Sequence, residues 1–64
     1  MSMDSNAVVT IEELDRQGNV WRRVVSHMVR ESVDVSLVAI RSGYNMERTR
    51  IRVDGHVVAE PRRP

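Results

Sequence analysis

The pair Asp54-Gly55 constrains the fold more than any other feature, because it stands between two short runs rich in β-branched residues. Both residues accept the positive φ angles of a type I′ turn, whose twist matches that of two antiparallel strands. We therefore predict a β-hairpin over residues 48–60. The two-residue loop also sets the register. The expected pairs are Val53 with His56, Arg52 with Val57, Ile51 with Val58, Arg50 with Ala59 and Thr49 with Glu60.

The first strand of this hairpin has two different faces, because side chains alternate along a strand. One face carries Arg48, Arg50 and Arg52. The other carries apolar side chains and one threonine: Thr49, Ile51 and Val53. We expect the arginines to lie on the surface and the second set to join the core.

A first strand is predicted for Ala7–Leu14, because this segment is dense in β-branched residues. The alternative is a short helix that begins with Thr10 and Glu13 as a capping box and ends at Gly18. Residues 15–18 form a turn under either interpretation.

Residues 20–32 show apolar pairs separated by polar pairs, a period that places the apolar side chains on one stripe of a helix. We predict an amphipathic helix there, with Asn19 as its N-cap. Residues 33–41 alternate and then become continuously apolar, which favours a strand buried on both faces. The expected fold is a small two-layer α+β domain in the order β-α-β-β-β, with a mostly antiparallel sheet.

Sixty-four residues without a cysteine predict one domain that buries only about 60% of its unfolded surface. We assign residues 1–6 to a frayed N-terminus, residues 7–60 to the domain and residues 61–64 to a polar tail. Homo-oligomerisation is expected, since it would bury more apolar surface. The chain shows no leader and no apolar run of about 20 residues, so we predict a cytoplasmic protein without a membrane.

Charge is unevenly distributed although the net charge is only +1. Residues 1–19 carry −3, residues 20–40 carry +1 and residues 41–64 carry +3. All ten basic residues are arginines, whose planar forks match phosphate and carboxylate groups. The basic C-terminal part indicates either an anionic partner or head-to-tail pairing between subunits.

The candidate binding residues follow from this distribution. They are the hairpin arginines Arg48, Arg50 and Arg52, the expected helix arginines Arg22, Arg23 and Arg30, and the loop residue Tyr44. A ribbon lined with arginine can contact phosphates and guanine edges, but the row is equally typical of a solvated strand face. Tyr44 is either a loop anchor or a contact residue, and Trp21 is expected in the core.

We therefore predict a small non-enzymatic binding protein, a regulator that binds DNA or RNA through an arginine-lined hairpin. The alternative is a protein-protein interaction module, such as an antitoxin, inhibitor or assembly subunit, that docks on an acidic partner. No catalytic residue and no cofactor is predicted. His27 and His56 lack the spacing of metal ligands, and no glycine-rich phosphate loop is present.

Two short segments are similar to known DNA-binding families. Ile51–Glu60 resembles the terminal hairpin of lambda Cro-type repressors and the hairpins of AbrB and MazE-type swapped-hairpin proteins. Ala39 and Gly43 have the spacing of a helix-turn-helix, although Thr49 stands where that motif has an apolar residue. These resemblances imply DNA binding but assign no family.

Overall fold

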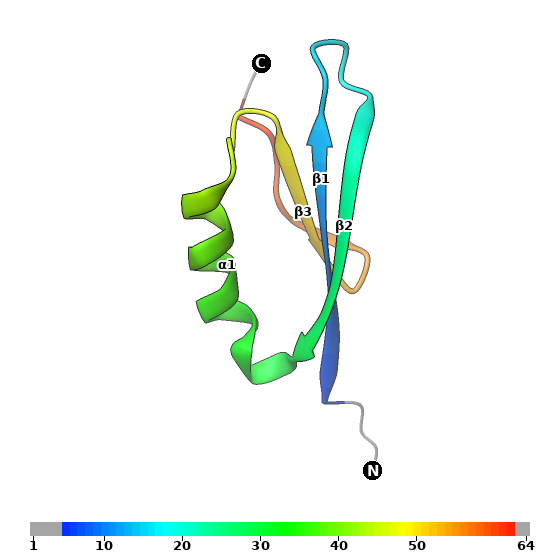
Figure 1. Ribbon diagram of the computed structural model, residues 1–64. Coiled ribbons are helices and arrows are strands. Elements are labelled where there is room, and N and C mark those ends of the chain that lie inside the picture. Colours follow the sequence, from blue (N-terminus) through cyan, green and yellow to red (C-terminus); the bar gives the residue numbers. More distant parts are fainter. Residues whose placement is uncertain (1–4, 63–64) are drawn as a thin grey trace.

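The computed structural model describes residues 5–62. Its elements are β1 (Asn6–Leu14), β2 (Val20–Val29), the 3₁₀ turn η1 (Arg30–Ser32), α1 (Val33–Gly43), β3 (Thr49–Val53) and β4 (His56–Ala59). The four strands form one antiparallel sheet in the order β2-β1-β3-β4, and α1 lies against one face of it (Figure 1). The expected two-layer α+β domain is thereby confirmed.

The strand prediction for Ala7–Leu14 is correct, and β1 begins one residue earlier, at Asn6. Of the expected frayed N-terminus, residues 1–4 lie outside the described part of the chain. The β1–β2 turn is held by Asp15, whose Oδ1 accepts hydrogen bonds from the backbone N–H groups of Gln17 (2.9 Å) and Asn19 (2.8 Å). Gly18 adopts a φ of 88° in this turn, a conformation that glycine adopts without strain.

The helix predicted over residues 20–32 is wrong, because Val20–Val29 forms strand β2 and only Arg30–Ser32 is helical, as a 3₁₀ turn. Valine is stiff at χ1 and favours strands, and β2 contains four valines. A strand splits each apolar pair between its two faces: Val24 is half-buried on the α1 side, whereas Val25 is 52% exposed on the opposite side. A helix would have placed all six apolar residues of this segment on one buried stripe.

The strand predicted over residues 33–41 is wrong as well, because Val33–Gly43 forms α1. Val33, Leu37 and Ile40 are spaced as one helical stripe and pack against the core. Topology requires this helix: β2 and β3 both run antiparallel to β1, so they run parallel to each other and need a crossover between them. The element order is therefore β-β-α-β-β, not β-α-β-β-β.

The C-terminal hairpin is confirmed, with φ of 53° at Asp54 and 86° at Gly55 as a type I′ turn requires. Val53 pairs with His56, and Arg52 with Val57, as predicted. A register shift then pairs Ile51 with Ala59 instead of Val58. The three expected pairs beyond this point are therefore not formed as predicted.

The hydrophobic core lies between α1 and the sheet face that α1 covers. Its buried members come from three elements: Ala7, Val9 and Ile11 of β1, Ile51 of β3 and Val33 of α1. Thr49 is also buried on this side, where its hydroxyl donates to the Asn45 carbonyl oxygen at 2.6 Å. Within residues 5–62, no helix has the length and apolar character needed to cross a membrane.

Candidate binding face of the sheet

The face of the sheet that points away from α1 is the candidate binding surface, and we name it the open face. Residues paired across neighbouring strands share a face, so the register defines its members. They are Val8, Thr10 and Glu12 of β1, Arg23, Val25, His27 and Val29 of β2, Arg50 and Arg52 of β3, and Val57 of β4.

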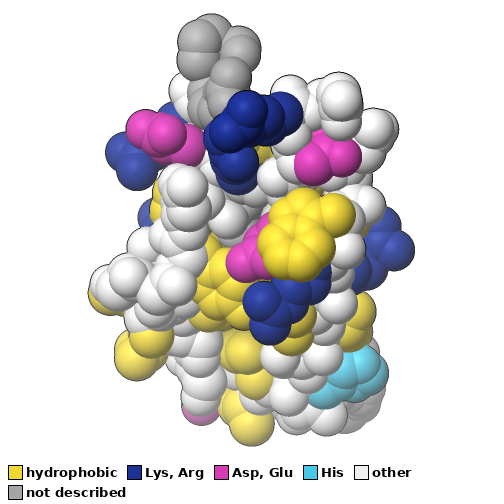
Figure 2. Space-filling model, turned by 45° about the horizontal axis from the view of Figure 1, so that its top comes forward, with side chains coloured by type: hydrophobic (Ala, Val, Ile, Leu, Met, Phe, Trp, Pro, Cys, Tyr) yellow, Lys and Arg dark blue, Asp and Glu magenta, His cyan; other side chains and the backbone are white. Residues whose placement is uncertain are grey.

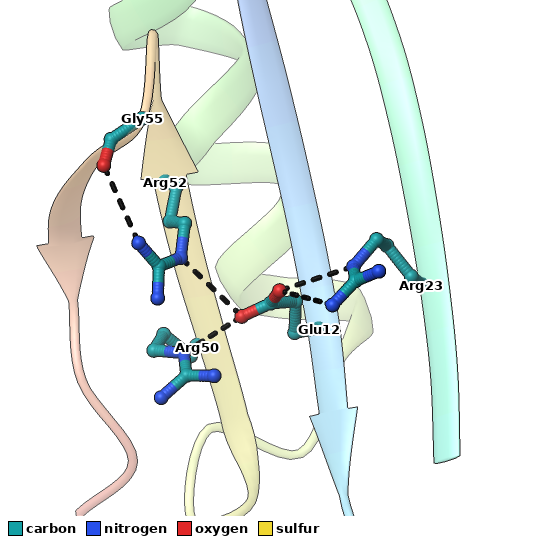
Figure 3. Close-up of polar contacts among 5 residues, drawn as sticks. All are labelled: Glu12, Arg23, Arg50, Arg52 and Gly55. Carbon is teal, nitrogen blue, oxygen red and sulfur yellow. Dashed lines mark hydrogen bonds and ion pairs between the residues drawn. The ribbon is translucent and has the colours of Figure 1, made fainter. Parts of the chain in front are cut away.

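Glu12 lies at the centre of the open face and is bonded to three arginines (Figure 3). Its Oε2 accepts from Nε (3.1 Å) and Nη2 (3.0 Å) of Arg23 on β2. Its Oε1 accepts from Nε of Arg50 at 2.7 Å and from Nε of Arg52 at 3.4 Å, both on β3. We name Glu12 with Arg23, Arg50 and Arg52 the arginine cluster.

The sheet register brings this cluster together. Glu12 stands directly opposite Arg23 in β2 and opposite Arg50 in β3, and Arg52 is two residues along on the same face. Neighbouring strands lie about 4.8 Å apart, so side chains from both flanking strands reach the central carboxylate.

Glu12 is only 4% exposed, although it lies on the face without a helix, because the arginine side chains cover it. Burial raises the pKa of Glu12, but hydrogen bonds from Arg50 and Arg23 outweigh this effect, so the pKa lies below its ordinary value. Glu12 is therefore ionised at neutral pH. Its charge holds the three guanidinium groups in fixed positions.

The arginine cluster retains a charge of +2, from three guanidinium groups and one carboxylate. Its arginine side chains are 56%, 27% and 35% exposed at positions 23, 50 and 52. Within residues 5–62, Arg50 uses only Nε in these contacts, while Arg52 also bonds the Gly55 carbonyl oxygen through Nη1 at 3.3 Å. Outward-facing N–H donors therefore remain for a ligand.

The other predicted arginines are separated from this cluster. Arg22 points to the α1 side of the sheet, where it forms an ion pair with Glu13 at 3.6 Å. Arg30 follows the end of β2 and binds Asp54 at 2.7 Å and the Asn6 carbonyl oxygen at 2.7 Å. The expectation that Arg22, Arg23 and Arg30 share a helix surface is wrong, because this segment is not a helix.

Arg48 precedes β3 and is half-buried. It lines a shallow hollow of about 200 Å³ together with Leu14 and Trp21. In the part of the chain that the structure describes, its guanidinium group has no ion pair. Arg48 is thus the predicted hairpin arginine with the least restrained charge.

The two aromatic residues lie in different environments, and only the environment of Trp21 differs from the expectation. Trp21 was predicted in the core but is 64% exposed, beside a hollow that Glu13 and Thr49 also line. Tyr44 follows α1 and packs, half-buried, against the hydrophobic core, which fits a loop anchor. Trp21 lies at the register shift between β1 and β2 and has no partner in β1, so the alternation of β2 does not place its ring in the core.

The surface mixes charge types. Figure 2, in which the end bearing the β1–β2 turn comes forward, shows arginines beside acidic and hydrophobic side chains and no continuous basic field. On the side of the molecule shown there, a polyanion would therefore meet a few localised guanidinium groups.

No protein-family model, curated protein or solved structure matches this chain. The helix-turn-helix spacing is not supported by the fold, because β3 follows α1 where a second helix would stand. Functional inference therefore depends on the open face itself.

Proposed function

We propose that this protein is a non-enzymatic binding protein that holds a nucleic acid across its open face. The observation that carries the proposal is the arginine cluster, in which a buried carboxylate orients three partly exposed guanidinium groups. Arginine forks match the geometry of phosphate oxygens and form strong charge-assisted hydrogen bonds with them.

Glu12 lowers the cost of such binding. An arginine side chain that is free in solution loses rotamer freedom when it contacts a ligand. Arg23 and Arg50 are already held by hydrogen bonds of 3.1 and 2.7 Å to Glu12, so part of that loss has occurred before the ligand arrives. The cluster therefore acts as a preformed cationic site.

The exposed ring of Trp21 supports a nucleic acid as the anionic partner. Trp21 lies two residues from Arg23 in β2, and it lines one hollow together with Arg48. Stacking of a base on an aromatic ring contributes about 1–3 kcal/mol in proteins that bind single strands. Because β2 is an edge strand, a flexible single strand that crosses this edge could place phosphates on the cluster and stack one base on Trp21.

The absence of an enzymatic role is part of the proposal, and the state of Glu12 supports it. Among residues 5–62, Glu12 is the buried carboxylate, and its lowered pKa keeps it ionised. A general acid needs a raised pKa, and a general base needs access to a substrate proton. Glu12 has neither.

The test is fluorescence anisotropy with labelled single-stranded RNA and duplex DNA over a range of salt concentrations. For three phosphate contacts, log K is expected to fall against log salt with a slope of about −2 for a single strand. Arg52→Gln removes one charge while sparing the shorter bonds of Glu12, and it should flatten the slope by about 0.7.

The matched control is Arg16→Gln, which removes the same charge from the exposed β1–β2 turn. This variant should bind with the same salt slope as the unmodified protein. Equal slopes for both variants, or no binding at low salt, would refute the proposal. Circular dichroism of each variant verifies that it is folded.

A protein partner is the second candidate, and the apolar side chains of the open face favour it. Val8, Val25, Val29 and Val57 are 36–52% exposed around the cluster. Tryptophan and arginine are enriched at the energetic centres of protein interfaces. A partner bound through these side chains would give affinity that depends weakly on salt, in contrast to a polyanion.

A further inference from the structure

A hollow of about 200 Å³ lies at the end of the sheet that carries the β1–β2 turn, outside the arginine cluster (Figure 1). It is lined by Glu13, Leu14, Trp21, Asn45, Arg48 and Thr49. Glu12 and Glu13 are consecutive in β1 and point to opposite faces of the sheet, so Glu13 lies on the α1 side. Pockets for drug-sized molecules measure about 300–1,000 Å³. This hollow therefore suits a smaller group, such as one nucleobase.

Glu13 brings two hydrogen-bond acceptors to the hollow. Its side chain is 20% exposed, and within residues 5–62 its ionic contact is with Arg22, at 3.6 Å. Because this distance exceeds that of a hydrogen bond, both carboxylate oxygens can still accept from a ligand. A carboxylate that is largely removed from water also binds a donor more strongly than one that is fully hydrated.

Two donor groups line the same hollow. Asn45 accepts from the Glu47 N–H through Oδ1 at 3.0 Å, which leaves the hydrogens on Nδ2 to donate. Arg48 has no ion pair in the part of the chain that the structure describes. The hollow thus combines a carboxylate, two donor groups and the exposed ring of Trp21.

We propose that this hollow binds a guanine base, which stacks on Trp21 and donates its N1–H and N2–H to the Glu13 carboxylate. Guanine is the RNA base whose Watson–Crick edge carries two adjacent donors. A carboxylate only accepts, so it can bind both donors of guanine at once but a single donor of any other base. The guanine atoms O6 and N7 are acceptors, and they suit the donors of Asn45 and Arg48. The inference rests on the proposed function, because it names the base that a bound single strand presents to Trp21.

Charged ligands fit the hollow less well than a base. A cation is attracted by an aromatic ring and a carboxylate, but Arg48 lines the hollow and Arg22 contacts the carboxylate, and both repel a further cation. A small anion without donors would meet the charge of Glu13, which is equally unfavourable. A neutral, planar ring with donors on one edge and acceptors on another is complementary to all of these groups.

One nucleic-acid strand can occupy the hollow and the arginine cluster together. The two lie on opposite faces of the sheet, and β2 is the edge strand between them. Trp21 precedes Arg23 by two residues, which span about 7 Å of β2. A strand that crosses the β2 edge therefore places a guanine in the hollow and phosphates close to it on the cluster. In this arrangement the hollow reads the base, and the cluster supplies affinity that does not depend on sequence.

The test is fluorescence anisotropy with labelled oligouridylates of one length that carry a single central guanosine, inosine, adenosine or uridine. We expect the guanosine oligonucleotide to bind at least about tenfold more tightly than the adenosine one. Inosine lacks the 2-amino group and loses one of the two donors, so its affinity should lie between them. Equal affinities for all four oligonucleotides overturn the inference and leave the proposed function intact, since phosphate contacts do not distinguish bases.

Glu13→Gln tests the assigned contact, because the amide keeps the shape of the side chain and replaces one acceptor with a donor. This variant should bind the guanosine and adenosine oligonucleotides equally, without weaker binding of the uridine one. The matched control is Glu31→Gln, which removes the same charge from the exposed turn η1 at the opposite end of the molecule and should keep the preference (Figure 1). A Glu13→Gln variant that still prefers guanosine overturns the inference. Circular dichroism verifies that both variants are folded.

Trp21 fluorescence tests the hollow without the arginine cluster. Trp21 is the single tryptophan of the chain, so quenching of its emission reports a base stacked at this position. Guanosine monophosphate should quench at a concentration at least about tenfold lower than adenosine monophosphate, which carries the same phosphate. If no oligonucleotide binds, the proposed function fails and this titration decides the inference separately. Equal quenching by the two nucleotides, or none by guanosine monophosphate up to roughly 10 mM, refutes it.

Discussion

Replacement of Glu12 by glutamine tests whether the open face is organised by one carboxylate. The substitution preserves the shape of the side chain and removes its charge. One amide oxygen still accepts from Arg50, but the amide nitrogen meets the N–H donors of Arg23, whose Nε and Nη2 lie 3.1 and 3.0 Å from Oε2. Three guanidinium groups then lie together without a counter-charge.

The expected loss follows from burial and exposure. Breaking a buried ion pair costs about 3–5 kcal/mol. The arginine partners are 27–56% exposed, so water and salt screen part of this loss. We expect the free energy of unfolding to fall by about 2 kcal/mol, which for a chain of this size lowers Tm by roughly 8–16 °C. The total stability at this length is about 3–10 kcal/mol.

Urea and thermal unfolding followed by far-UV circular dichroism measure this change. Trp21 fluorescence is a poor probe, because the ring is already 64% exposed in the folded chain. All variants are compared at one protein concentration, since association would shift the midpoint. The matched control is Glu13→Gln, which breaks a longer contact of 3.6 Å to Arg22 and should cost no more than about 0.5 kcal/mol.

Two results would refute the reasoning. One is a Glu12→Gln variant within about 0.5 kcal/mol of the unmodified chain, the size of an ordinary surface substitution. The other is additive behaviour of Glu12→Gln and Arg50→Gln, because residues joined by a 2.7 Å ion pair should show a coupling energy of at least about 0.5 kcal/mol.

Two further predictions concern acid stability and the core. The pKa of Glu12 is lower in the folded chain, so its contribution to stability is present above the ordinary pKa of about 4.3 and is lost as the pH falls through the folded-state value. The urea midpoint should therefore fall as the pH is lowered, and it should fall less steeply with pH in the Glu12→Gln variant. Equal pH dependence of the midpoint in both proteins would contradict this. Some slope remains, since hydrogen bonds from Val8 and Arg30 also lower the pKa of Asp54. Ile51→Ala should cost about 2–5 kcal/mol, because Ile51 is fully buried. Val35→Ala, at an exposed position, should cost less than about 0.5 kcal/mol in the same urea titration, and similar losses would misplace the core.

The C-terminal hairpin was predictable from sequence because its determinants are local. Asp54 and Gly55 adopt positive φ angles, and the two-residue loop fixes the first pairs. The register shift beyond Arg52 was not predictable, since the sequence near the bulge carries no glycine or other distinct signal. β1 was also predictable, because its β-branched density agrees with a strand.

The exchange of helix and strand between residues 20 and 43 has a physical cause. Both segments are apolar enough to satisfy either periodicity, and local propensity does not decide between them. The decision is made by topology, which pairs β2 with β1 and requires α1 as the crossover to β3. Periodicity predicts structure only where apolar residues are buried, and Val25 is an apolar residue that is 52% exposed.

The candidate site was predicted in part. Arg50 and Arg52 were placed on one exposed face, and the register confirms that position. Glu12 was missed, because its role depends on pairing with residues 11 and 38 positions away. Sequence offered one signal: Glu12 and Glu13 follow directly after the β-branched run of β1, and a carboxylate that becomes buried there needs partners.

The central position of β1 also governs how the chain can fold during synthesis. β1 and β2 are consecutive in the sequence and can pair as soon as both are synthesised, but β1 also lies next to β3, and Ile11 pairs with Ile51, which is forty residues later. Until β3 is synthesised, β1 has a neighbouring strand on only one side, and α1 does not yet connect β2 to a paired β3. Ordering such distant segments is slow. A β1–β2 hairpin without β3 therefore exposes the edges of both strands. The edge of β1 is covered only when β3 pairs with it.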